Sequence, residues 1–113
     1  MADHIKVTAA DGTWVVRAGG AVLGESNNVL ELREGSYPPV IYFPREDIAM
    51  DFLDKTTKSS HCPWKGDASY YSIQTKSVLI DNAAWSYEAP LDDMQQIAGY
   101  ISFYPDKAAV EQL

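Results

Sequence analysis

Cys62 is the only thiol of the 113-residue chain, and it stands between His61 and the nearby Lys65. A thiol close to a cation can have a lowered pKa and act as a nucleophile. Adjacent residues on an extended chain point to opposite sides, however, so His61 is poorly placed to serve as the base of Cys62. Lone cysteines are also commonly small buried hydrophobes. Two interpretations of Cys62 therefore stay open: a candidate nucleophile or a packing residue.

Arg45 follows Pro44, which favours the start of a helix, and a cation in the first helical turn opposes the helix dipole. The residues three and four positions onward are Ile48 and Ala49, so no acid on the same face compensates this charge. Arg45 must therefore pair with a distant acid, bind an anionic ligand or lie exposed. Its planar guanidinium suits a carboxylate or a phosphate held by two hydrogen bonds.

A basic segment precedes an acidic one. Residues 55–66 contain no acid but carry Lys55, Lys58, His61 and Lys65, whereas residues 81–93 contain no base but carry Asp81, Glu88, Asp92 and Asp93. The basic segment could attract a small anion or the acidic segment of a second copy, which would give a homodimer. It is equally consistent with a solvated surface loop, because isolated charges usually contribute little.

Aromatic side chains flank these segments. They are Tyr42, Phe43, Trp64, Tyr70, Tyr71, Trp85 and Tyr87. Tyrosine and tryptophan combine an apolar ring with a polar tip, which suits the wall of a ligand cleft, although a core and its rim would need the same residues. If residues 69–75 form a strand, one ring of the Tyr70-Tyr71 pair must face the core and the other must face outward.

Charge and composition exclude several classes of function. The chain carries 9 basic and 16 acidic residues, and this excess of acid disfavours nucleic acid as a partner. No segment approaches the roughly 18 apolar residues of a membrane helix, and the first residues lack the apolar run of a secretory signal. A single cysteine gives no internal disulfide, so we expect a cytoplasmic protein.

Neither a metal nor a cofactor is expected. A structural zinc site needs four thiolate or imidazole ligands, and the chain offers His4, His61 and Cys62 alone. Glycine-rich phosphate loops and nucleophile elbows are absent as well. The adjacent Asp92 and Asp93 are better explained as acids at a helix start than as ligands for catalytic metal ions.

The elements that must position these residues are mainly β-strands. Residues 4–25 predict a three-stranded meander with turns at Asp11-Gly12 and Gly19-Gly20, since Gly accepts positive φ at little cost. Further strands are expected at 29–33, 40–43, 69–75, 78–85 and 100–104, short helices after Pro44 and Pro90, a polar loop at 55–66 and a loose tail at 106–113. The predicted architecture is one domain of two packed antiparallel sheets with two short helices, its core spanning 4–105.

Five motifs in order resemble a known family: Tyr-Phe-Pro-Arg-Glu-Asp at 42–47, Cys-Pro-Trp-Lys-Gly at 62–66, Ala-x-Tyr-Tyr at 68–71, Ala-Trp-Ser-Tyr-Glu-x-Pro at 84–90 and Gly-Tyr-Ile-Ser-Phe-Tyr-Pro at 99–105. It is the bacterial and fungal domain-of-unknown-function family four-twenty-seven, also labelled nucleotidyltransferase-like. The resemblance implies a compact, mainly β domain, similar to the β-tent folds of Yippee and methionine sulfoxide reductase B. It also implies a shared cleft that includes Cys62 and Gly66.

These observations together favour a binding module for a small anionic or polar ligand in an aromatic-lined cleft. Arg45 and Lys65 would receive the ligand, Glu46 or Glu88 would orient them, and Tyr70, Trp85 and Tyr87 would form the walls. Two alternatives remain: an enzyme that uses Cys62 or cleft carboxylates, and a homodimeric interaction module that pairs through a strand edge.

Overall fold

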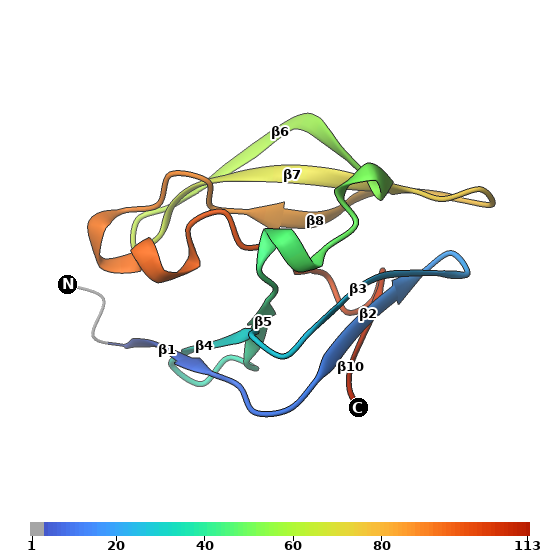
Figure 1. Ribbon diagram of the computed structural model, residues 1–113. Coiled ribbons are helices and arrows are strands. Elements are labelled where there is room, and N and C mark those ends of the chain that lie inside the picture. Colours follow the sequence, from blue (N-terminus) through green and yellow to red (C-terminus); the bar gives the residue numbers. More distant parts are fainter. Residues whose placement is uncertain (1–3) are drawn as a thin grey trace.

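Three antiparallel sheets make up the computed structural model, which describes residues 4–113 (Figure 1). The first has the order β1-β4-β5, the second β10-β2-β3 and the third β6-β7-β8-β9. Their bounds are β1 Ile5–Ala9, β2 Trp14–Ala18, β3 Ala21–Ser26, β4 Leu30–Glu34, β5 Val40–Tyr42, β6 Leu53–Cys62, β7 Gly66–Gln74, β8 Leu79–Ser86, β9 Ser102–Phe103 and β10 Ala109–Gln112. The mainly β prediction is confirmed. The two three-stranded sheets lie side by side beneath the four-stranded one, so three sheets replace the two expected.

The predicted three-stranded meander at the N-terminus is only partly present in the structure. Strands β2 and β3 form the predicted hairpin at Gly19-Gly20, where both glycines have positive φ. Strand β1, however, pairs with β4 instead of β2, from Ile5 opposite Glu34 to Ala9 opposite Leu30. The turn at Asp11-Gly12 therefore carries the chain from one sheet to another. The reason is packing, because β1 and β4 bury Ile5 and Leu32 in a different core cluster from β2 and β3.

Two segments predicted as irregular are strands. Residues 53–62 form β6, which pairs with β7 at the edge of the four-stranded sheet and keeps most of its side chains exposed. A polar edge strand has no apolar alternation to reveal it. Similarly, the tail expected to be loose forms β10, in which Val110 lies opposite Val16 of β2.

The predicted helices are short 3-10 turns: η1 Arg45–Asp47, η2 Met50–Phe52 and η3 Asp92–Ile97. After η1 the chain becomes extended at Ile48, with φ −107° and ψ 135°, since this buried residue forms a bridge to Gly24 of β3. Tertiary pairing thus interrupts the helix that the four-residue spacing predicted.

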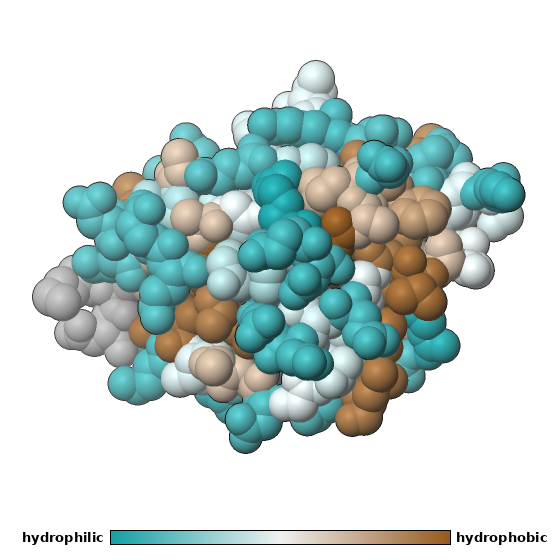
Figure 2. Space-filling view, in the orientation of Figure 1, coloured by the Kyte–Doolittle hydropathy of each residue, from teal (hydrophilic) through white to brown (hydrophobic). Residues whose placement is uncertain are grey.

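Two clusters of buried side chains hold the layers together. The first is aliphatic and includes Val16, Leu23, Phe43, Ile73 and Ile101. The second is rich in tyrosine and contains Ile5, Leu32, Tyr42, Ala68, Tyr70, Tyr87, Met94 and Ile97. Figure 2 shows that hydrophilic residues cover most of one face, while apolar residues reach the surface between the layers. The tyrosine-rich cluster places the hydroxyl-bearing rings of Tyr42, Tyr70 and Tyr87 among apolar side chains.

Candidate functional site

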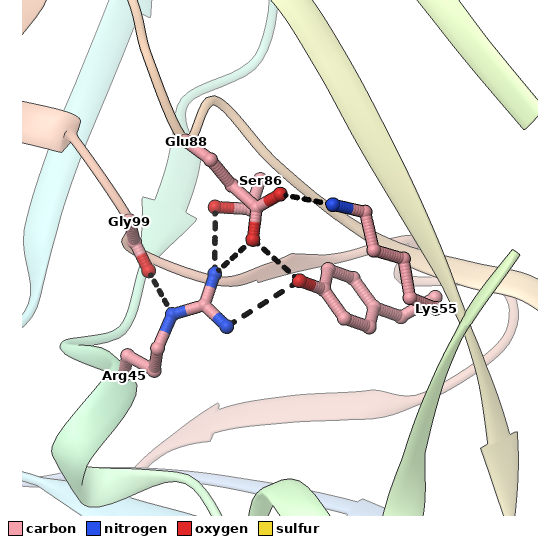
Figure 3. A network of polar contacts seen from close by, with 6 residues as sticks. Arg45, Lys55, Ser86, Glu88 and Gly99 are labelled. Atoms are coloured by element: carbon pink, nitrogen blue, oxygen red, sulfur yellow. Dashed lines mark hydrogen bonds and ion pairs between the residues drawn. The ribbon is translucent and has the colours of Figure 1, made fainter.

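Arg45, the first residue of η1, lies at the centre of a polar network (Figure 3). Its Nε donates to the carbonyl oxygen of Gly99 at 3.0 Å, and its Nη2 donates to Oε2 of Glu88 at 2.8 Å. Longer hydrogen bonds join Nη1 to the Tyr71 hydroxyl at 3.3 Å and Nη2 to the Ser86 hydroxyl at 3.4 Å. We call this network the Arg45–Glu88 cluster; its members are Arg45, Lys55, Tyr71, Ser86, Glu88 and Gly99.

Glu88 accepts three strong hydrogen bonds in this cluster. Besides the bond from Arg45, its Oε2 accepts the Tyr71 hydroxyl at 2.6 Å and its Oε1 accepts Nζ of Lys55 at 2.8 Å. Burial alone would raise the pKa of Glu88, but hydrogen bonds from Lys55, Tyr71 and Ser69 outweigh it and lower the pKa to about 2. The carboxylate is therefore ionised at neutral pH and unsuited to act as a general acid or base there.

Arg45 pairs with a distant acid, which was one of the three alternatives expected for it. Its partners are the distant carboxylate of Glu88 and the carbonyl oxygen of Gly99, so the uncompensated charge is balanced within the protein. The cluster also ties η1 to β7, to the end of β8 and to the segment before β9. Glu46 is exposed and, within residues 4–113, its side chain makes no hydrogen bond or ion pair with this cluster.

A pocket of about 700 Å³ opens next to the tyrosine-rich cluster. We call it the aromatic pocket, because its lining includes Trp14, Tyr37, Tyr42, Tyr70, Trp85, Tyr87, Phe103 and Tyr104. The rings come from strands of all three sheets and from the segments before β5, after β8 and after β9. Its volume and largely aromatic wall fall in the range typical of small-molecule sites.

The charged side chains in the lining are Glu31, Glu34 and Lys65. Lys65 is held by the Cys62–Gly66 turn, as the Pro and Gly spacing predicted, and its backbone N–H donates to the Cys62 carbonyl at 3.2 Å. Its Nζ donates to Oε1 of Glu34 at 2.7 Å, and only 11% of the side chain is exposed. The ammonium is thus neutralised within the pocket by a carboxylate 31 residues away in sequence.

The tyrosine hydroxyls of the pocket differ in their partners. The Tyr42 hydroxyl accepts a hydrogen bond from Nε1 of Trp85 at 3.2 Å, and the Tyr70 hydroxyl bonds Oγ of Ser60 at 2.8 Å. Tyr87 is only 7% exposed, and its hydroxyl has no hydrogen-bond partner among residues 4–113. Since no fully buried side-chain polar atom in this part of the chain lacks a partner, the Tyr87 hydroxyl must reach accessible space.

Burial, followed by the neighbouring Tyr42 and Cys62, raises the pKa of Tyr87 well above its usual range. The pKa of Tyr42 is raised by burial as well, against the lowering effect of the Trp85 hydrogen bond. Desolvation and the hydrogen bond with Tyr70 raise the pKa of Tyr104 to about 12. These phenols therefore keep their protons at neutral pH and present O–H groups.

Six of the predicted site residues fall into two groups, while Glu46 and Cys62 belong to neither. Lys65, Tyr70, Trp85 and Tyr87 line the pocket, whereas Arg45 and Glu88 form the other cluster. Along the chain the two sets interleave: Trp85 and Tyr87 belong to the pocket, and Ser86 and Glu88 belong to the cluster. Trp85 and Ser86 are successive residues of β8 and point to opposite faces, and Tyr87 and Glu88, which follow the end of β8, continue the same division.

Tyr70 and Tyr71 follow the same rule, with one correction. Tyr70 joins the tyrosine-rich cluster and Tyr71 joins the aliphatic one, but both are buried, so the prediction that one ring faces outward is wrong. Both faces of β7 are covered at this point.

Cys62 ends β6 and packs, half-buried, against the tyrosine-rich cluster without lining the pocket. The imidazole of its neighbour His61 hydrogen-bonds Asp67 at 2.7 Å. A nucleophilic role for Cys62 stays a prediction.

Glu34, Tyr104 and the Gly99 carbonyl are among the groups of the site that were not predicted from the sequence. Tyr104 and Gly99 lie in the Gly-Tyr-Ile-Ser-Phe-Tyr-Pro motif, which was a usable signal. Glu34 carried no signal, because its pairing with Lys65 depends on how β4 meets the β6–β7 turn.

A family model described as "Domain of unknown function (DUF427)" matches residues 6–112. The chain belongs to this family. The match confirms the resemblance predicted from the five motifs, and the family description assigns no activity. A search of curated proteins found no match.

Two further observations concern metal ligands and helix length. Within residues 4–113, His, Cys, Asp and Glu side chains nowhere gather in threes in a way that could hold a metal ion. In the same range, no helix is long and apolar enough to cross a membrane.

Proposed function

We propose that this DUF427 domain is a binding module for a small polar molecule with an aromatic or apolar body, taken up by the aromatic pocket. The observation that carries the proposal is the combination of an aromatic-lined hollow of about 700 Å³ with a Tyr87 hydroxyl that has no partner in residues 4–113. Small-molecule sites typically combine apolar walls with a few convergent polar groups. Lys65, Tyr70, Trp85 and Tyr87 are the proposed ligand-contacting residues.

Arg45, Glu46 and Glu88 are left out of this proposal. Both donor sides of the Arg45 guanidinium are engaged by Gly99, Glu88 and Tyr71. An anion held jointly by Arg45 and Lys65 would have to displace two carboxylates, Glu88 and Glu34. This balance of charge favours a polar ligand over an anionic one.

A fragment screen by protein-observed NMR tests the proposal on the full chain. We expect aromatic fragments to shift the amide signals of Tyr42, Trp85 and Tyr87, and to leave those of Arg45 and Gly99 in place. A fragment at about 100 times its dissociation constant should also stabilise the fold by roughly 2.7 kcal/mol in a thermal unfolding assay.

Two variants make the screen specific. Trp85→Leu removes one aromatic wall and should weaken every pocket binder, whereas Glu88→Gln changes only the Arg45–Glu88 cluster and should leave binding as in the parent chain. A screen in which no fragment shifts the pocket signals, or in which the shifts centre on Arg45, would contradict the proposal.

A further inference from the structure

We infer that the ligand of the aromatic pocket is a neutral, flat molecule that presents a carbonyl oxygen, such as an aromatic carboxamide, and that the Tyr87 hydroxyl donates a hydrogen bond to this oxygen. The inference rests on the proposed binding function and adds the chemical class of the ligand. It follows from three features of the pocket: which polar groups are unpartnered, what they can donate, and how the charges are balanced.

The unpartnered groups are phenol donors. Tyr87 is more than nine-tenths buried and lines the pocket, yet its hydroxyl has no partner in residues 4–113. The Tyr42 hydroxyl accepts from Trp85 Nε1, and its own proton has no acceptor in the same range. The Tyr87 hydroxyl reaches accessible space and its residue lines the pocket, so its O–H is free to donate to an acceptor that enters there. Tyr42 is only 2% exposed, and buried hydroxyls in native proteins are nearly always hydrogen-bonded, so its O–H also calls for an acceptor.

The charges of the pocket argue against a charged ligand group. Among the lining residues, Lys65 is bound by Glu34 at 2.7 Å, and Glu31 is bound by the guanidinium of Arg33 outside the lining. A ligand carboxylate would meet Lys65 only by displacing Glu34. An ammonium would suit the acidic groups and the ring faces, but it would leave the phenol protons without an acceptor. A neutral carbonyl oxygen satisfies the donors and disturbs neither ion pair.

The rings set the shape of the ligand. Trp85 stacks at a tilt on Tyr104, with ring centroids 4.6 Å apart, and meets Tyr42 edge-on at 6.3 Å. Aromatic walls of this kind contact a flat ring well and at low entropic cost. A planar ring bearing a carboxamide therefore matches both the wall and the donors.

Three probes that share one ring test the inference on the full chain: 2-naphthamide, 2-naphthoate and 2-naphthylmethylammonium, each titrated at neutral pH by protein-observed NMR. We expect 2-naphthamide to bind at least fivefold more tightly than either charged probe. Tyr87→Phe, which removes only the hydroxyl, should weaken 2-naphthamide about tenfold and leave the ammonium probe unchanged. The matched control Tyr71→Phe removes a buried hydroxyl outside the pocket and should leave all three affinities unchanged.

The possible results separate the inference from the function on which it rests. If none of the probes shifts the pocket signals, the proposed binding function fails with the inference. If 2-naphthoate or the ammonium probe binds most tightly, the ligand class is wrong while the binding function stands. If 2-naphthamide binds most tightly but Tyr87→Phe leaves its affinity intact, the role of Tyr87 is overturned. The parent-chain titrations need no variant, so the ligand class is decided even if Tyr87→Phe folds poorly.

Discussion

The Arg45–Glu88 cluster and the aromatic pocket use neighbouring residues of β7, of β8 and of the segment that follows β8, yet they differ in one respect. In the cluster, the Glu88 carboxylate accepts hydrogen bonds at both oxygens, and the Arg45 guanidinium donates from all three nitrogens. In the pocket, the phenol of Tyr87 is left without a hydrogen-bond partner in the described chain. A closed polar network rigidifies a fold, whereas a buried polar group that reaches an open hollow is available to a ligand.

Alternation along the strands makes this division possible. Tyr70 lies opposite Trp85 in the β7–β8 ladder, and both line the pocket, while Tyr71 and Ser86 bond to Arg45. Shifting either strand by one residue would exchange the two sets between faces. The cluster, which crosses from η1 to β7 and β8, therefore also protects the register that builds the pocket.

The largest expected effect on stability comes from disrupting the Arg45–Glu88 cluster. Glu88→Gln removes the charge that three donors share, and we expect it to lower the free energy of unfolding by about 2 kcal/mol, because hydrogen bonds to charged groups contribute about 1.5–3 kcal/mol. Urea unfolding measures the change. Lys55→Met, which removes the most exposed donor, serves as the control and should change stability far less. Equal stability of Glu88→Gln and the parent chain would show that the cluster does not hold the fold.

Low pH should disrupt the Arg45–Glu88 cluster without a mutation. The pKa of Glu88 is lowered from 4.5 to about 2, so its ionised form contributes stability above pH 4.5, and this contribution is lost as the pH falls toward 2. We expect the stability difference between the parent chain and Glu88→Gln to shrink steadily from pH 5 to pH 2. Urea unfolding of both proteins across this range measures it, and a difference independent of pH would contradict the assignment.

Local sequence signals predicted where the strands lie better than which strands pair with each other. Gly19-Gly20 gave the β2–β3 hairpin correctly, but the equally good turn signal at Asp11-Gly12 joins strands of different sheets. A turn motif reports backbone conformation, whereas pairing depends on which core each strand buries. Strand β6 was not predicted, because its exposed side chains show no apolar alternation.

The candidate site was predictable in part for a related reason. Four of the residues that the motifs singled out, Lys65, Tyr70, Trp85 and Tyr87, line one pocket, and their role in binding stays a prediction. The motifs also drew in Arg45 and Glu88, although the alternation in Trp-Ser-Tyr-Glu already places Glu88 apart from Trp85 and Tyr87. The pairing of Lys65 with Glu34 spans 31 residues and two sheets, and no local pattern encodes it.

The smallest expected effects on stability come from two variants that compare the cluster with the pocket directly. Tyr71→Phe and Tyr87→Phe each delete one hydroxyl from a residue that is 5% or 7% exposed. The Tyr71 hydroxyl donates to Glu88 at 2.6 Å, so its loss should lower the free energy of unfolding by about 1 kcal/mol.

The Tyr87 hydroxyl bonds no residue of the described chain and reaches accessible space, so its loss should leave the free energy of unfolding within about 0.5 kcal/mol of the parent value. Urea unfolding of the two variants side by side measures both values. A Tyr87→Phe variant as destabilised as Tyr71→Phe would mean that the Tyr87 hydroxyl stabilises the fold. The contrast between the hydrogen-bonded cluster and the pocket with a free hydroxyl would then be wrong.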